Sequence, residues 1–182
     1  SGEELSNIIA EASGKISILI AGGSSGSSLE NRSLALTRDF SRGGQSPVYS
    51  YCDSPSGETY VSTLMSVLRF AKDGTLAGEI SGYGSGPGEF QAVYKVRTDA
   101  AGNVYLLDYA AGKVIKYGRD GSFQKEIRTG TGYPMSMAVS GDGTIAVSET
   151  GKNQVTLLSA PYTSPKTVTA GELSLISGLY CY

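Results

Sequence analysis

The chain has 182 residues, a formal net charge of -2 and only 18% charged side chains, which is enough length for one domain with its own core. No basic stripe is present to neutralise phosphates, and no run approaches the roughly 18 apolar residues that a membrane span needs. We therefore expect no nucleic acid partner and no membrane span. Because residues 1–21 lack the pattern of a secretion signal, we also expect a mature or trimmed form.

The residue types favour a turn-dense all-β protein and leave little room for catalysis. Gly accounts for 25 residues, whereas His and Trp are absent. Without histidine, a histidine-ligated metal, a histidine general base and a Ser-His-Asp triad are all excluded. We therefore predict a protein that is not an enzyme, with no catalytic, cofactor-binding or metal-binding residues.

The first 28 residues are predicted to form an N-terminal arm. Residues 1–13 have the apolar spacing of a short amphipathic helix, and residues 15–21 alternate as a strand. The Gly/Ser run at 22–28 is typical of a flexible tether, native or engineered. A tethered apolar strand either adds to a neighbouring subunit or folds back onto its own domain. The predicted assembly strand is carried by Ile16, Ile18, Leu19 and Ile20.

A repeat organises the remaining residues, which we predict to be a second domain over 29–182. The segments 54–63, 99–108 and 140–149 superimpose as a polar turn with glycine followed by an alternating strand, at offsets of 45 and 41 residues. Each is followed by a second apolar strand. This unit is typical of a propeller blade, a four-stranded sheet whose faces are buried only when neighbouring blades stack on it.

Three blades are predicted, at about 48–80, 93–127 and 134–169. In the middle blade, apolar residues on both sides of the strand at 104–107 indicate a sheet covered by a blade on each face. The fold class is therefore all-β, with propeller-like blades of four short antiparallel strands. Strand-like pieces remain near the termini, and their pairing would give a fourth blade. These pieces are 15–21, 33–40, 172–177 and 179–182.

Two cysteines, Cys52 and Cys181, lie far apart in the sequence and lack the spacing of a metal site. They are either two free buried thiols or a disulfide, and we favour the disulfide. Closing so long a loop would stabilise the fold by about 4–5 kcal/mol. A disulfide requires an oxidising compartment, so we expect an extracellular or cell-surface location.

Two groups of polar side chains could carry chemistry. Carboxylates recur at the repeat turns, where an aspartate accepts a hydrogen bond from the backbone two residues on, so we interpret them as structural and keep a calcium site as the alternative. They are Asp99, Asp108, Asp120, Asp142 and Glu149. Many of the twelve tyrosines recur near the predicted blade rims, either as a platform for a carbohydrate or peptide or as half-buried packing. These rim tyrosines are Tyr49, Tyr51, Tyr60, Tyr83, Tyr94, Tyr105, Tyr109, Tyr117 and Tyr133. Asn31 begins a glycosylation sequon.

The segment 84–127 resembles one full repeat of the NHL-repeat β-propeller family. It has the lead-in GPGEF, the turn DAAGN and a strand that ends at Asp108, whereas Val93 replaces the proline expected there. Looser copies extend the resemblance over about 48–169. The resemblance implies a propeller fold. Related propellers include lyases and lactonases, whose metal ions lie in the central channel and are held by histidines or carboxylates. Other members of the resembled family bind proteins or glycans.

We therefore expect a non-catalytic extracellular structural or interaction protein. The first hypothesis is a self-assembling subunit that forms a homo-oligomer or a filament through its N-terminal strand. The alternative is a monomeric propeller that binds a protein or a glycan through its rim. A propeller lactonase or lyase is the third hypothesis and the weakest.

Overall fold

The computed structural model describes residues 49–63, 65–149, 151–152 and 154–169, together with the backbone of three strands nearer the N-terminus. The chain divides into two compact units, Ser1–Pro47 and Val48–Tyr182. The predicted domain boundary at residue 28 falls outside the described residues and stays a prediction. Within the described residues no helix is long and apolar enough to cross a membrane.

The first unit contains a three-stranded antiparallel sheet. Its strands are β1 (Leu5–Ala10), β2 (Lys15–Ala21) and β3 (Arg38–Asp39), with β2 in the middle. The predicted helix over 1–13 is therefore wrong. The run Leu5–Ala10 pairs with β2, placing Ile8 opposite Ile18, and pairing between β-branched residues outweighs weak helical spacing.

The second unit contains three four-stranded antiparallel sheets, each in the strand order of the chain. The three blades predicted from the repeat are confirmed. The first comprises β4 (Ser50–Asp53), β5 (Thr59–Ser62), β6 (Ser66–Phe70) and β7 (Leu76–Ser81); the second β8 (Val93–Thr98), β9 (Val104–Asp108), β10 (Lys113–Tyr117) and β11 (Phe123–Arg128); the third β12 (Pro134–Val139), β13 (Ile145–Glu149), β14 (Gln154–Leu158) and β15 (Lys166–Thr169).

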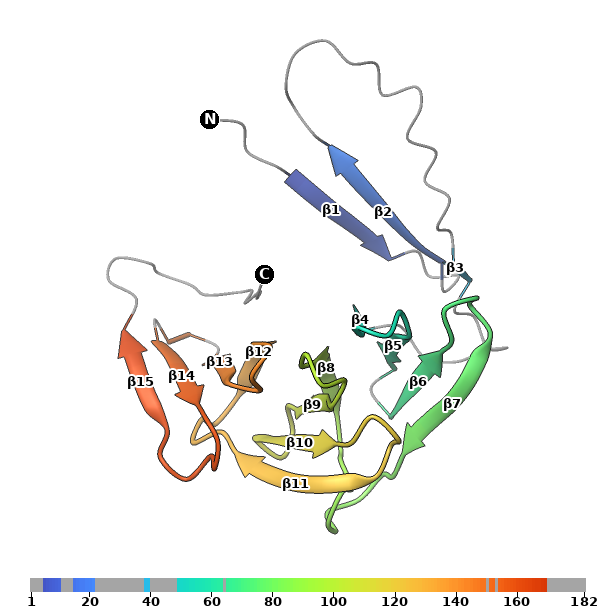
Figure 1. Cartoon of the computed structure of the whole chain (residues 1–182). Helices are drawn as coiled ribbons and strands as arrows, with labels where there is room; N and C mark the ends of the chain where they lie inside the picture. Colours follow the sequence, from blue (N-terminus) through green and yellow to red (C-terminus); the bar gives the residue numbers. More distant parts are fainter. Residues whose placement is uncertain are drawn as a thin grey trace. The chain divides into compact units, whose positions relative to one another are not determined.

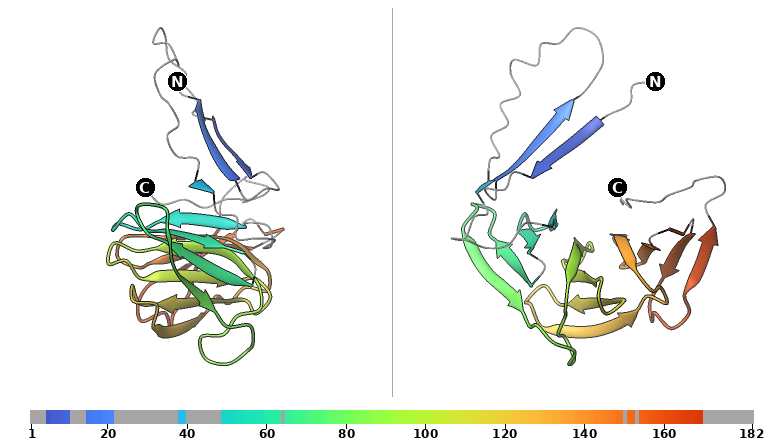
Figure 2. Two further views of the ribbon diagram at one scale, coloured as in Figure 1. Left: turned by 90° about the vertical axis from the view of Figure 1, so that its right-hand side faces the viewer. Right: turned by 180° about the vertical axis from the view of Figure 1, so that it is seen from behind.

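The blades fan out with the first strand of each on the inner side of an arc. Figure 1 shows β4, β8 and β12 on that inner side and β7, β11 and β15 at the periphery. In the side view of Figure 2 the strands of successive blades run across the unit in layers. This radial stacking is the arrangement of a β-propeller.

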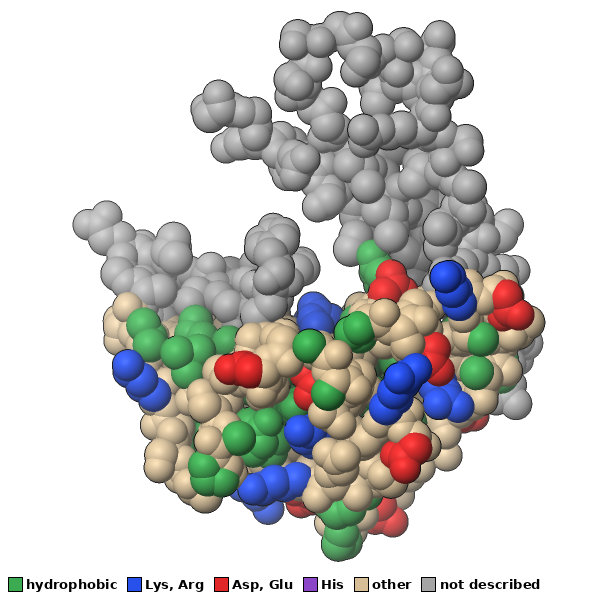
Figure 3. All heavy atoms as spheres, viewed as in Figure 1, with side chains coloured by type: hydrophobic (Ala, Val, Ile, Leu, Met, Phe, Trp, Pro, Cys, Tyr) green, Lys and Arg blue, Asp and Glu red, His purple; other side chains and the backbone are tan. Residues whose placement is uncertain are grey.

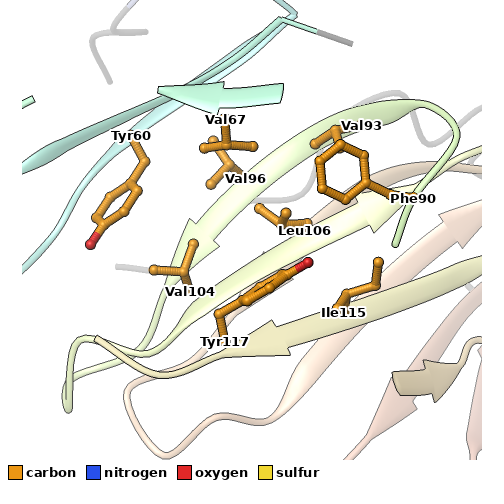
Figure 4. Packing of buried hydrophobic residues seen from close by; sticks show 9 residues of the cluster. All are labelled: Tyr60, Val67, Phe90, Val93, Val96, Val104, Leu106, Ile115 and Tyr117. Carbon is orange, nitrogen blue, oxygen red and sulfur yellow. The ribbon is translucent and has the colours of Figure 1, made fainter. Parts of the chain in front are cut away.

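The middle blade is covered on both faces, as its sequence predicts. Residues Val104 and Leu106 of β9 belong to one core cluster, and their neighbours Tyr105 and Leu107 belong to another. Alternate side chains of a strand point to opposite faces, so each cluster is an interface between two blades. The first interface, shown in Figure 4, contains Tyr60, Val67, Phe90, Val93, Val96, Val104, Leu106, Ile115 and Tyr117. The second interface contains Tyr105, Leu107, Val114, Ile127, Met137, Val139, Ile145, Val147 and Leu158.

A fourth blade made by the two termini stays a prediction. The pieces Lys15–Ala21 and Arg38–Asp39 belong to the sheet of the first unit, where they pair with each other. The pieces at 172–177 and 179–182 lie outside the described residues.

Candidate functional site

The carboxylates at the repeat turns hold the backbone, as the structural interpretation predicts. Asp99, Asp120 and Asp142 each accept a hydrogen bond from the backbone N–H two residues on, at 3.0 Å. Hydrogen bonds from Ser122 hold the pKa of Asp120 below its usual value, and the hydroxyl of Ser140 is the main cause of the same shift at Asp142.

The two remaining carboxylates are also engaged. Asp108 is fully buried and accepts hydrogen bonds from the backbone N–H groups of Gln91, Ala92 and Ala111, at 2.9–3.2 Å. Glu149 forms an ion pair with Lys152 at 2.9 Å. Among the described residues, no three His, Cys, Asp or Glu side chains form a group that could hold a metal ion.

The structure gives no support to the predicted disulfide. Cys52 of β4 is a free thiol, and burial raises its pKa to about 12. Cys181 lies outside the described residues, as does the sequon at Asn31.

The predicted assembly strand is β2, and it is the central strand of its sheet. Its backbone pairs with β1 on one side, with Leu19 opposite Asn7 and Ile20 opposite Ser6. On the other side it pairs with β3, where Ile16 lies opposite Arg38. The strand prediction is confirmed, while its use in assembly stays a prediction.

The feature that stands out as a candidate binding surface is a row of four tyrosines across the three blades, which we call the tyrosine row. Tyr49 lies 5.3 Å from Tyr94, Tyr94 lies 4.6 Å from Tyr109, and Tyr109 lies 6.0 Å from Tyr133, between ring centroids. The interplanar angles of 35–51° give tilted pairs, which aromatic rings prefer over face-to-face stacking.

The repeat places these four side chains at one end of the inner strands. Tyr49 and Tyr133 come directly before β4 and β12, Tyr94 is the second residue of β8, and Tyr109 directly follows β9. Strands β8 and β9 are antiparallel, with Val93 opposite Asp108, so the start of one meets the end of the other. The backbone N–H of Tyr109 donates to the carbonyl of Ala92 at 2.9 Å, which fixes the corner where the middle pair meets.

The two ends of the row are open to solvent. The side chains of Tyr49 and Tyr133 are 37% and 62% exposed, and those of Tyr94 and Tyr109 are partly exposed. A partner can therefore contact ring faces and hydroxyl groups from three blades at once. Not every predicted rim tyrosine belongs to this surface, because Tyr60, Tyr105 and Tyr117 are buried in the interfaces.

Beside the row, the inner strands β4 and β8 are tied by polar contacts. The hydroxyl of Ser50 accepts hydrogen bonds from the guanidinium of Arg97, at 3.2 Å, and from the backbone N–H of Val96, at 3.4 Å. Burial, and next the charge of Arg97, lower the pKa of Lys95 on the same strand. The face drawn in Figure 3 has acidic and basic side chains intermingled, without a large patch of one sign.

Comparisons with known proteins agree with the fold. The family DUF5128, described as a 6-bladed beta-propeller, matches residues 60–143, less than half of the chain. No curated protein matches the sequence. Streptogramin B lyase aligns with a TM-score of 0.61 at 14% identity, over 75% of this chain and 45% of that chain.

Two further structures show the same architecture. Virginiamycin B lyase from Staphylococcus aureus aligns with a TM-score of 0.57 at 14% identity, over 92% of this chain and 56% of that chain. The RRP9 WD40 repeats align with a TM-score of 0.63 at 12% identity, over 76% and 43%. The chain thus spans about half the length of these structures. At such identities the likeness shows the fold alone: this is a β-propeller protein, and the resemblance to propeller repeats is confirmed at that level.

Proposed function

We propose that this chain is a non-catalytic interaction module that binds a polypeptide segment along the tyrosine row. The observation that carries the proposal is the continuity of four rings over three blades, with both end rings exposed. Rows of aromatic side chains form the grooves in which several small domains hold extended, proline-rich peptides. Tyrosine suits this use because its ring gives a large contact area at a low cost in conformational entropy, and its hydroxyl adds a hydrogen bond.

The small net charge of the chain, -2, favours a neutral, extended partner over a strongly charged one. An uncharged peptide loses little in desolvation when it lies on such a surface, whereas a polyanion would need a basic patch.

The test compares the wild-type chain with Tyr109→Ala, which removes the ring that joins the two halves of the row. The control is Tyr83→Ala, since Tyr83 is 67% exposed and has no ring contact with the row. The three proteins are applied to an array of proline-rich decapeptides and to an array of polysaccharides. Peptide binding that Tyr109→Ala loses and Tyr83→Ala keeps supports the proposal. Polysaccharide binding with the same sensitivity would make the chain a glycan-binding module instead, and equal binding by all three proteins refutes the use of the row.

A second candidate function is that of a self-assembling structural subunit outside the cell. The third blade favours it, because the face turned away from the second interface carries the cross-strand row Ala146, Leu157 and Lys166. Val168 at the peripheral strand is 43% exposed. A sheet from a second copy could pack there, as blades pack on each other.

Light scattering on the full chain and on a variant lacking residues 1–28 tests this second candidate. Assembly that disappears with the deletion supports joining through the N-terminal strands. Assembly that survives it but is lost in Leu157→Glu supports joining through the blade face. A monodisperse monomer at all concentrations refutes both routes.

A further inference from the structure

The first two blades carry equivalent rows of side chains on the face that each turns toward the next blade. In the first blade, Arg69 of β6 lies opposite Tyr60 of β5 and Gly78 of β7. In the second blade, Lys116 of β10 likewise lies opposite Tyr105 of β9 and Lys125 of β11. The rows thus agree in a tyrosine and a cation and differ at the peripheral strand, where glycine replaces lysine.

At the second interface, a tyrosine of the third blade lies against this row. The hydroxyl of Tyr162 lies 3.4 Å from that of Tyr105 and donates to the carbonyl of Gly143 at 2.9 Å. The ammonium of Lys125 lies 5.6 Å from the centroid of the Tyr162 ring and donates to the carbonyl of Pro161. The space between the blades is therefore filled by a phenol ring that a cation and a hydroxyl hold in place.

The residue equivalent to Tyr162 in the second blade is Gly121. Each is the fourth residue of the turn between the last two strands of its blade, and each donates its N–H to the carbonyl of the first residue, Ser159 or Gly118. Both have a left-handed backbone, with φ of 67° at Tyr162 and 84° at Gly121. That conformation costs a tyrosine about 1 kcal/mol or more, and at Tyr162 the contacts of the ring offset it.

At the first interface, Gly78 takes the place of Lys125 and Gly121 takes the place of Tyr162. The first interface therefore has a cleft where the second interface has a phenol ring. The cleft has a volume of about 360 Å³. One wall is formed by Tyr60, Arg69 and Gly78, and the other by Tyr117, Gly121 and Phe123. A cavity of about 150 Å³ already accommodates benzene, so by volume this open cleft, which Glu79, Arg119 and Asp120 also line, has room for a substituted ring.

We propose that the cleft between the first two blades binds a single phenolic ring, in the position that Tyr162 takes between the second and third blades. Tyr117 and Phe123, 6.3 Å apart and nearly perpendicular, provide an aromatic wall. Arg69 provides the cation: its guanidinium donates a hydrogen bond to the hydroxyl of Tyr60, and its other contacts are long, 3.8 Å to Glu58 and 3.4 Å to the carbonyl of Ala77. Tyr60 is equivalent to Tyr105 and offers its hydroxyl to that of the ligand. The phenol is either a free aromatic compound or a tyrosine of a polypeptide.

The test follows the amide signals of Arg69, Gly78 and Gly121 by NMR while the full chain is titrated with p-cresol, toluene or N-acetyl-tyrosinamide. We expect saturable shifts with the two phenols, and binding of toluene at least about tenfold weaker because it lacks the hydroxyl. Tighter binding of N-acetyl-tyrosinamide than of p-cresol indicates a polypeptide tyrosine, and the reverse indicates a free compound. Absence of shifts with both phenols, or equal binding of toluene, overturns the proposal.

Two variants locate the site. Gly78→Lys copies the second blade, and the added side chain fits because a Cβ there would lie 3.5 Å from the Arg69 guanidinium, an ordinary contact. We expect it to fill the cleft and abolish the p-cresol shifts at unchanged melting temperature. Its control is Ala77→Lys, which adds the same charge at the preceding, exposed residue, outside the lining of the cleft, and should bind as wild type. Loss of binding in both variants, or in neither, overturns the assignment.

The converse variant, Tyr162→Gly, opens the equivalent space at the second interface. If the cleft is the vacant form of that space, p-cresol should bind there too. The melting temperature of Tyr162→Gly should then rise with p-cresol by more than that of the wild-type chain. A variant that melts lower and is not stabilised by p-cresol contradicts the equivalence of the two positions.

Discussion

Replacing Asp108 with alanine should destabilise the second unit far more than the same change at an exposed aspartate of a repeat turn. The carboxylate of Asp108 is fully buried and joins two segments, because it accepts from the N–H groups of Gln91 and Ala92 before β8 and from that of Ala111 after β9. Removing it leaves three donors without their acceptor at partly buried positions. At about 1 kcal/mol per donor, the free energy of unfolding should fall by about 3 kcal/mol.

The assay is thermal unfolding followed by circular dichroism, with urea unfolding for the free energy. A loss of about 3 kcal/mol corresponds to a melting temperature lower by roughly 6–12 °C for a chain of this size. The control is Asp120→Ala, because the carboxylate of Asp120 makes a similar turn contact, with Ser122, in full contact with solvent. It should change the free energy of unfolding by no more than about 0.5 kcal/mol. Equal effects of the two variants would refute the reasoning that burial and the joining of two segments set the magnitude.

Three further predictions concern charged and ionisable groups. Glu126→Gln should lower the free energy of unfolding in urea by about 2–3 kcal/mol, because the ammonium of Lys113, 4% exposed and 2.7 Å from Glu126, loses its counter-charge; an unchanged midpoint would contradict this. In a Cys181→Ser background, Cys52 should react with a disulfide reagent at pH 8 roughly a thousandfold more slowly than in the unfolded chain, because its pKa is about 12; equal rates would refute the burial of the thiol. Because hydrogen bonds lower the pKa of Asp142 in the folded state, its contribution to stability is present above its unfolded pKa of 3.8 and is lost as the pH falls through the folded pKa. The melting temperatures of wild type and Asp142→Asn should therefore converge as the pH falls below about 4, and a constant difference down to pH 2 would contradict the shift.

The blades could be predicted from the sequence because each depends on local signals that recur. The glycines at 57, 102 and 143 all have positive φ, at 82–84°, and each begins the hairpin that the repeat predicted. The apolar residues on both sides of β9 indicated two covered faces, and the two clusters confirm them. Strand period and turn chemistry act within a few residues, so a single sequence reveals them.

The tyrosine row could be predicted only in part. The sequence showed that tyrosines recur near the blade rims, but three of them, Tyr60, Tyr105 and Tyr117, point into the interfaces instead. Which tyrosines meet depends on how the three blades stack. This stacking brings together residues that are far apart in the sequence, such as Tyr49 and Tyr94. The same holds for the cleft, since the difference between Gly121 and Tyr162 has a meaning only once the two turns are superimposed.

The helix predicted over 1–13 failed for a related reason. Its apolar spacing suits a short helix, and helices of that length are marginal without tertiary contacts. Pairing of Leu5–Ala10 with Lys15–Ala21 satisfies the backbone groups of both segments. A pattern of a dozen residues could not show that partner.

The stacking of the three blades underlies both the tyrosine row and the cleft, and methyl nuclear Overhauser spectroscopy on leucine- and valine-labelled protein tests it most directly. Leu106 and Leu107 are neighbours on β9 and are assigned to different interfaces. We expect the Leu106 methyl groups to contact residues of the first blade, such as Val67, and those of Leu107 to contact residues of the third blade, such as Val147. If both leucines contact the same set of side chains, the middle blade is not packed between two others and the account is wrong.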